Sequence, residues 1–162
     1  MSQRRQSFEI LRQLPVPSAL NLESGLFSST PHDTIHTLFG PLHYEPGYSY
    51  PLIVWLHGPG SDERQLMRIM PLVSMRNYVG VSPRGTLLQR PDEPQEIYGW
   101  SHTDEYLQQA EQRIFDTIEL ATQRYNINPR RIFLAGFDSG GTMAFRVALN
   151  YPHRFAGVMS LG

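Results

Sequence analysis

The sequence predicts an α/β fold with a mainly parallel sheet, and three patterns along the chain indicate it. Apolar runs of strand length alternate with segments whose apolar residues recur every three or four positions, as in amphipathic helices. The run at 50–58, "YPLIVWLHG", is almost continuously apolar, which is typical of a strand covered on both faces. Turn-forming residues separate the segments. This alternation favours a parallel sheet with helices on both faces.

The length and composition bound the domain organisation. A chain of 162 residues with 40% hydrophobic content can form one domain with a sizeable core, and two only with difficulty. Residues 1–30 are polar and interrupted by prolines, and we expect a loosely ordered arm. Residues 31–162 then form the α/β domain.

Charge and cysteine content exclude several classes of function. The net charge is −1, and all 14 basic residues are arginines scattered along the chain, so no surface for nucleic acid is expected. The absence of cysteine excludes disulfides, thiolate metal sites and a cysteine nucleophile. No segment has the apolar length of a signal peptide or a membrane span, so we expect a cytoplasmic protein.

The first half of the domain predicts an edge strand or hairpin at 34–46 and a central strand at 50–58. A helix is expected at 63–74, with Ser61 or Asp62 as its cap and Pro71 bending or ending it. A further strand is expected at 77–83.

The second half begins with a long polar loop at 84–101, of a length that is more often functional than idle. A long amphipathic helix from Leu107 to Tyr125 follows, with Ser101 or Thr103 as its cap. A buried strand within 128–137, a helix at 140–152 and a last strand at 154–162 complete the pattern.

The sequence "LAGFDSGGTM" at 134–143 lies where a strand turns into a helix. In α/β hydrolases the pattern G-x-S-x-G occupies this turn and holds a strained nucleophile above the sheet. Here Gly136 and Gly140 fill the outer places and Asp138 the middle one. Moving the frame so that Ser139 becomes the nucleophile places Phe137 where the crossing needs a glycine, so Asp138 is the favoured position.

Residues 125–162 resemble the phospholipase/carboxylesterase family, which includes acyl-protein thioesterases. "LIVWLHGPGSDERQL", "YVGVSPRG" and "YGWS" are similar to other parts of that family, so the resemblance covers about residues 34–162. It implies an α/β-hydrolase fold and hydrolysis of esters or thioesters. It also implies that Asp138 stands at the nucleophile position, with His57, Gly58, Pro59, Gly60 and Trp100 around the substrate pocket.

Three departures from the family argue against serine-esterase activity. An aspartate carboxylate attacking an ester would give an anhydride instead of an acyl-serine. In the family one oxyanion donor is the backbone N–H after the nucleophile, here Ser139, and the other comes from the third residue of the His-Gly-x-Gly turn, here Pro59, which has no N–H. Third, the triad acid and histidine follow the nucleophile in this fold, yet only His153 does so here. We therefore expect a C-terminally incomplete domain and a degenerate site.

Several alternatives stay open. Epoxide hydrolases and haloalkane dehalogenases use an aspartate at this turn, so Asp138 is either a nucleophile of that kind or a residue tolerated at positive φ. His57 is expected to brace its loop. Trp100 either lines an acyl pocket or packs over the core.

The pattern predicts few partners. We expect no cofactor and no metal site, since the two histidines of "HDTIH" lie in a segment that reads as extended. A small acyl-type ligand would suit the turn at Asp138. The apolar strand at 154–162 would leave an uncovered sheet edge through which copies of the chain could associate, and a non-catalytic binding or scaffold protein is the remaining alternative.

Overall fold

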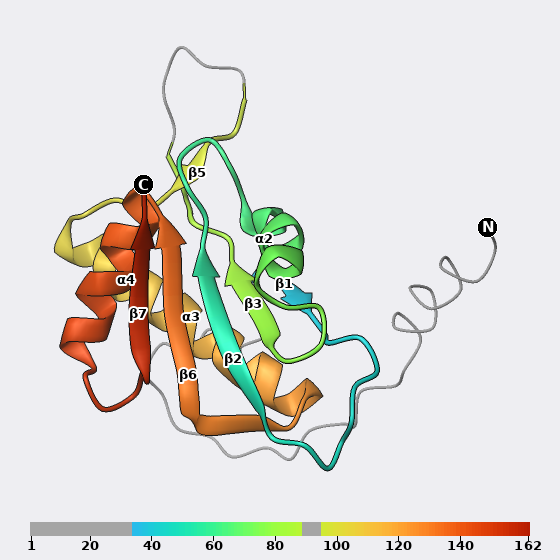
Figure 1. Ribbon diagram of the computed structural model, residues 1–162. Helices are drawn as coiled ribbons and strands as arrows, with labels where there is room; N and C mark the ends of the chain where they lie inside the picture. The colour runs from blue at the N-terminus through green and yellow to red at the C-terminus, as the bar shows by residue number, and fades with distance from the viewer. Residues whose placement is uncertain (1–33, 89–94) are drawn as a thin grey trace, which may run out of the picture.

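The computed structural model describes residues 34–88 and 95–162, which form a five-stranded sheet with helices on both faces (Figure 1). The predicted α/β class is confirmed. The expected arm at 1–30 lies outside the described residues. The strand order is β1-β3-β2-β6-β7. The strands are β1 (His36–Phe39), β2 (Tyr50–Leu56), β3 (Val79–Pro83), β6 (Ile127–Phe137) and β7 (Gly157–Leu161).

The central strand β2 is buried along its whole length, as its apolar run predicts. Its side chains alternate between two cores because successive residues of a strand point to opposite faces. Leu52, Val54 and Leu56 pack with residues of α3 (Asp104–Arg124) and α4 (Ser139–Asn150). Ile53 and Trp55 pack with α2 (Leu66–Val73) on the opposite face.

Four strands run in parallel, and β1 is the exception. It pairs antiparallel with β3, with Leu38 opposite Val81, and lies at one edge of the sheet as expected. The start of β1 therefore lies beside the end of β3, and the backbone N–H of Arg84 donates to the carbonyl oxygen of Ile35. This pairing brings Thr34 to the carboxyl edge of the parallel strands.

The helix after β2 begins as predicted with a polar cap. The side chain of Asp62 accepts a hydrogen bond from the backbone N–H of Arg64 at 2.9 Å and caps the 3₁₀ turn η2 (Glu63–Gln65), which leads into α2. Pro71 lies inside α2, and the helix ends two residues later at Val73. Asp62, and not Ser61, is the capping residue.

The expected loop at 84–101 contains a small antiparallel pair that the sequence did not predict. β4 (Thr86–Leu87) pairs with β5 (Tyr98–Gly99), with Thr86 opposite Gly99. Strands of two residues are too short to give an alternating pattern. Thr103 takes the N-cap position of α3, without a side-chain hydrogen bond.

The last strand, β7, forms the other edge of the described sheet and is covered unevenly. α4 packs on one face of β6 and β7. On the opposite face Met159 and Leu161 are 51% and 48% exposed, and Phe137 beside them on β6 is 43% exposed. The two faces of the sheet thus differ most at this end.

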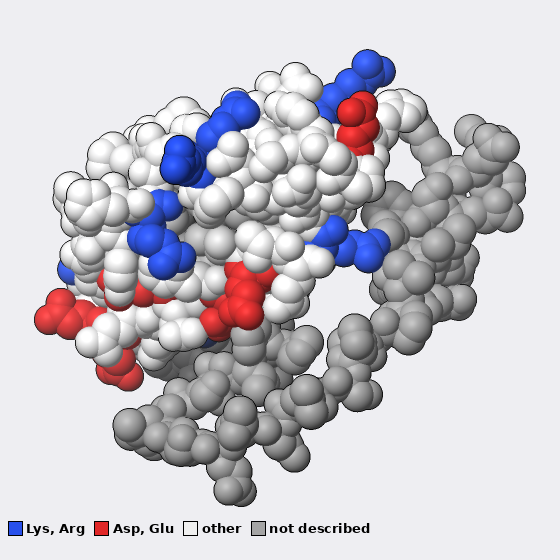
Figure 2. Space-filling model, turned by 90° about the horizontal axis from the view of Figure 1, so that it is seen from below, with Lys and Arg blue, Asp and Glu red and all other residues white. Residues whose placement is uncertain are grey.

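On one side of the molecule the positive charges of the described surface are spread out. Figure 2, which views the molecule of Figure 1 from below, shows arginines separated by uncharged surface instead of forming one patch. No helix in the described part of the chain is long and apolar enough to cross a membrane.

Candidate functional site

The turn at the end of β6, which we call the elbow (Gly136–Gly140), is a sharp strand-to-helix crossing. β6 ends at Phe137, Asp138 has φ 52° and ψ −120°, and α4 begins at Ser139. A non-glycine residue in such a conformation is strained by about 1–3 kcal/mol. Gly140 permits the crossing, because a Cβ atom there would lie 2.3 Å from the backbone oxygen of Leu56.

The side chain of Asp138 is exposed, and within the described chain its carboxylate accepts no hydrogen bond. The backbone instead holds the residue in place. Its N–H donates to the carbonyl oxygen of Leu161 at 2.8 Å, and its carbonyl oxygen accepts from the N–H of Thr142 at 3.0 Å. The conformation of the elbow therefore does not depend on the carboxylate.

The loop after β2 closes as a turn of four residues, Gly58–Ser61. The N–H of Ser61 donates to the carbonyl oxygen of Gly58 at 3.3 Å. Pro59 and Gly60 stand at the two central places, and the positive φ of Gly60, 69°, matches a type II turn, which favours proline first and glycine second. Both central residues are exposed. The turn is thus well formed, but Pro59 has no N–H to present.

His57 is fully buried beneath this turn, and both its ring nitrogens are occupied. Nδ1 lies 3.0 Å from the carbonyl oxygen of Gly58, and Nε2 accepts from the N–H of Gly85 at 2.9 Å. These partners require a neutral ring with its proton on Nδ1. Burial lowers the pKa of His57 below 6.5, although the Gly58 carbonyl opposes the shift. The ring joins two loops and contacts no solvent.

Trp100 is buried as well. It lies in the core cluster, and its Nε1 donates to the carbonyl oxygen of His57 at 2.9 Å. Gln65 completes the support from the other side, since its Oε1 accepts from the Nε1 of Trp55 at 2.8 Å and from the N–H of Gly58 at 3.2 Å. The predictions missed Gln65, and no sequence pattern marks it.

A partly buried ion pair joins η2 to the loop after β3, and the sequence did not indicate it. Both carboxylate oxygens of Glu63 accept from the guanidinium of Arg84 at 2.7 Å. Burial raises the pKa of Glu63, but the hydrogen bonds from Arg84 outweigh it and hold this pKa below 4.5. The guanidinium also stacks on the ring of Tyr98, 4.7 Å from its centroid.

His153 does not join the elbow. It follows α4, whose 12 residues span about 18 Å, and it precedes β7. It therefore lies near the amino ends of the parallel strands, whereas Asp138 lies at their carboxyl ends. No three His, Cys, Asp or Glu side chains gather as a metal site within residues 34–88 and 95–162.

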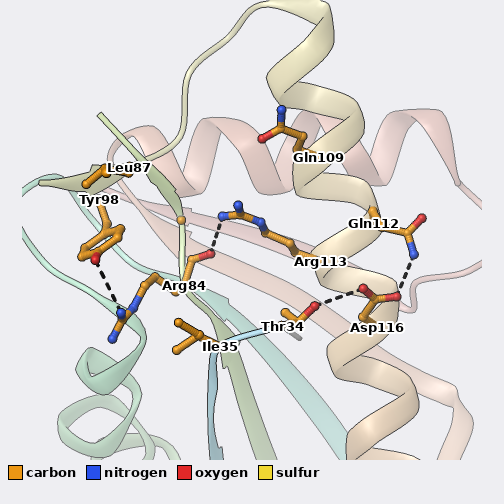
Figure 3. A pocket seen from close by; sticks show the side chains of 10 residues that line it. Thr34, Ile35, Arg84, Leu87, Tyr98, Gln109, Gln112, Arg113 and Asp116 are labelled. Carbon is orange, nitrogen blue, oxygen red and sulfur yellow. Dashed lines mark hydrogen bonds between the residues drawn. The ribbon is translucent and has the colours of Figure 1, made fainter. Parts of the chain in front are cut away.

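A second region at the carboxyl ends of the parallel strands contains a cavity of about 430 Å³ (Figure 3). It lies between α3 and the segments that begin β1 and follow β3. Neither Asp138 nor Pro59 borders it. The residues that line it are Thr34, Ile35, Arg84, Gly85, Leu87, Tyr98, Gln109, Gln112, Arg113 and Asp116.

Comparison with known proteins gives a family and a set of similar folds. A family model described as "Putative esterase" matches residues 28–162. The chain is similar to a carboxylesterase from Bacillus cereus, with 18% identity and a TM-score of 0.59 over 78% of this chain and 59% of that one. It is also similar to YahD, solved with malic acid, with 16% identity and a TM-score of 0.59 over 78% of this chain and 62% of YahD.

A third similar structure is an acetyl xylan esterase from Aspergillus awamori, with 14% identity and a TM-score of 0.62. The match covers 83% of this chain and 48% of that enzyme. The chain thus spans less than two thirds of the length of these structures. At identities this low the matches show the fold alone. The fold is that of an α/β hydrolase, and the matches cover only part of each esterase structure.

Proposed function

The chain belongs to the Esterase family, and we propose that it is a member without serine-esterase activity. The observation that carries this proposal is the aspartate at the strained position of the elbow, where Asp138 has φ 52° and ψ −120°. The conformation that presents a nucleophile is present, while the hydroxyl that would form an acyl-enzyme is replaced by a carboxylate. Attack of that carboxylate on an ester would form an anhydride, which is a poor route to ester hydrolysis.

The turn after β2 supports the same proposal. If a substrate carbonyl lies above Asp138, one oxyanion donor is the N–H of Ser139 at the start of α4. The second would come from position 59, which is a proline in a well-formed exposed turn. Removing one oxyanion donor costs about a hundred- to a thousandfold in rate.

The surroundings of the elbow also lack a base within the described chain. His57 is buried with both nitrogens engaged, and His153 lies at the far edge of the sheet. A serine hydroxyl at this position would need such a base, because a hydroxyl is a weak nucleophile at neutral pH. The aspartate at position 138 and the proline at position 59 would each reduce ester hydrolysis on their own.

The experiment is hydrolysis of p-nitrophenyl acetate by this chain and by Asp138→Ser, with and without Pro59→Gly. We expect every variant to stay at the background rate. Asp104→Asn, an exposed carboxylate on α3, is the matched control. Ester turnover by the natural sequence that Asp138→Asn abolishes would refute the proposal. Activity gained by Asp138→Ser alone would show that Pro59 and the missing base do not limit the rate.

A second candidate function rests on the freedom of the Asp138 carboxylate. Because it accepts no hydrogen bond from the described residues and faces solvent, it could attack an electrophilic carbon. With an epoxide, a carboxylate oxygen would bond to the ring carbon as the carbon–oxygen bond of the ring breaks. Water would supply the proton for the alkoxide and later hydrolyse the alkyl ester.

Incubation with styrene oxide tests this second function, with diol formation and the intact mass of the protein as readouts. Turnover, or a covalent adduct that is lost in Asp138→Asn, would establish an aspartate nucleophile. If neither diol nor adduct forms, the aspartate is not a nucleophile of this kind. The remaining alternative is then a non-catalytic binding protein.

A further inference from the structure

The cavity beside α3 contains two charged side chains, and neither forms an ion pair with the other or with a further residue of the described chain. Its volume of about 430 Å³ lies within the range of small-molecule sites. Four parts of the chain contribute to it: the residues just before β1, the loop after β3, the β4–β5 pair and one face of α3 (Figure 3). The two groups are Asp116 and Arg113.

Asp116 is the anionic group. It is only 6% exposed, and its carboxylate oxygens accept from the hydroxyl of Thr34 at 3.1 Å and from the side-chain amide of Gln112 at 2.7 Å. Both donors are uncharged. No cationic side chain of the described residues lies within 4 Å of it. A buried carboxylate without a cation is costly, so the carboxylate favours a positive partner.

Arg113 is the cationic group, and it is half-buried on the preceding turn of α3. One of its amino groups, Nη1, donates to the carbonyl oxygen of Arg84 at 2.9 Å. A guanidinium has five N–H groups, so most of its donors are left for another acceptor. Burial lowers the pKa of Arg113, and no carboxylate opposes the shift. The described chain therefore gives this cation no ionic partner.

The two side chains diverge. In Figure 3 Arg113 reaches across toward the carbonyl oxygen of Arg84, whereas Asp116 turns toward Thr34. The other guanidinium at the cavity, that of Arg84, is already paired with Glu63. Among the residues that the structure describes, the cavity thus presents one positive and one negative group without an ionic partner, held apart from each other.

From this arrangement we propose that the cavity binds a small zwitterion, whose carboxylate pairs with Arg113 and whose ammonium group pairs with Asp116. Leu87 and the ring of Tyr98 line the remaining wall and would contact the carbon chain of the ligand. Binding would give each buried charge an ionic partner without breaking the hydrogen bonds it already makes. The site is separate from the elbow.

The test is calorimetric titration of this chain with glycine, β-alanine and γ-aminobutyrate, which hold their charges at increasing separation. Propionate and propylamine carry one charge each and are the matched single-charge ligands. We expect at least one zwitterion to bind at least tenfold more tightly than either of them. Equal binding of propionate would overturn the proposal in favour of a simple anion site, and no binding of any zwitterion would overturn it altogether.

Variants locate the site. Arg113→Gln and Asp116→Asn should each weaken binding of the zwitterion at least tenfold. Arg124→Gln and Asp104→Asn, exposed positions on the same helix, should leave it unchanged. Leu87→Trp enlarges a side chain of the cavity wall while both charged residues stay in place, so it should also abolish binding. Unchanged affinity in Leu87→Trp, or in a folded Arg113→Gln, would place the ligand elsewhere and overturn the proposal.

Discussion

The elbow at Asp138 and the buried cluster around His57 both lie at the carboxyl ends of the parallel strands. Different kinds of contact hold the two regions in place. The cluster depends on side chains: the ring of His57 joins Gly58 to Gly85, and Trp100 donates to the His57 carbonyl. The elbow depends on backbone hydrogen bonds and on the close approach at Gly140, while the side chain of Asp138 accepts no hydrogen bond from the described residues. The shape of the elbow and the identity of its central residue are therefore separable.

The largest effect is expected from Gly140→Ala. A Cβ atom there would lie within 2.5 Å of the carbonyl oxygens of Leu56 and His57, which are backbone atoms and cannot turn aside. We expect the free energy of unfolding, measured with urea, to fall by about 3 kcal/mol.

Gly47→Ala is the control, since nothing lies within 4 Å of a Cβ atom at that position. Its effect should stay within about 0.5 kcal/mol. If Gly140→Ala were as mild as this control, close approach would not be what holds the elbow.

His57→Ala tests the other region in the comparison, the buried cluster around His57. It removes a buried ring and leaves the N–H of Gly85 without that acceptor. We expect a loss of about 2–3 kcal/mol in the free energy of unfolding, measured in the same way. His153→Ala, at an exposed position, should change little. A mild effect at His57 would show that the cluster does not depend on its ring.

The pH dependence of stability sharpens the role of His57. Because burial lowers its pKa in the folded protein below 6.5, the unfolded chain binds more protons as the pH falls past that value. The contribution of His57 is therefore complete above about pH 6.5 and declines below it, until the pH reaches the pKa of the folded state. Urea unfolding from pH 7.5 to 5 should show this decline, and His57→Gln should flatten it.

The smallest effect is expected at Asp138. Asp138→Asn should alter the free energy of unfolding by no more than about 0.5 kcal/mol, because the exposed carboxylate accepts no hydrogen bond from the described residues. Asp138→Gly should raise stability by about 1 kcal/mol through relief of the positive φ. Chemical denaturation measures both. A loss above 2 kcal/mol in Asp138→Asn would mean that the carboxylate holds the turn after all.

Sequence pattern was sufficient for the long elements. The apolar run of β2, the three- and four-residue spacing of α3 and the turn between β6 and α4 are local signals, and the structure has each element where its signal lies. The pair β4–β5 escaped because each strand has two residues. Pro71 marked the end of α2 only to within two residues, since a proline can be accommodated in a helix.

The supports of the site were less accessible to prediction. Gln65 accepts a hydrogen bond from Gly58, and Glu63 accepts hydrogen bonds from Arg84. The second of these contacts joins residues 21 positions apart. No periodicity or motif records such a contact. The pairing of Arg113 with the Arg84 carbonyl, 29 positions away, escaped for the same reason. The sequence pattern did mark Asp138 and Pro59, because each residue departs from a motif of a few neighbouring residues.

The place of β2 at the centre of the sheet has a consequence for synthesis on the ribosome. One neighbour, β3, follows closely, but Val54 pairs with Leu134 across 80 residues. At about 5–20 residues per second, roughly 4–16 seconds pass before that partner is made. During this interval the most apolar strand of the domain has one open edge, and nascent chains of this protein should depend on chaperones until β6 emerges.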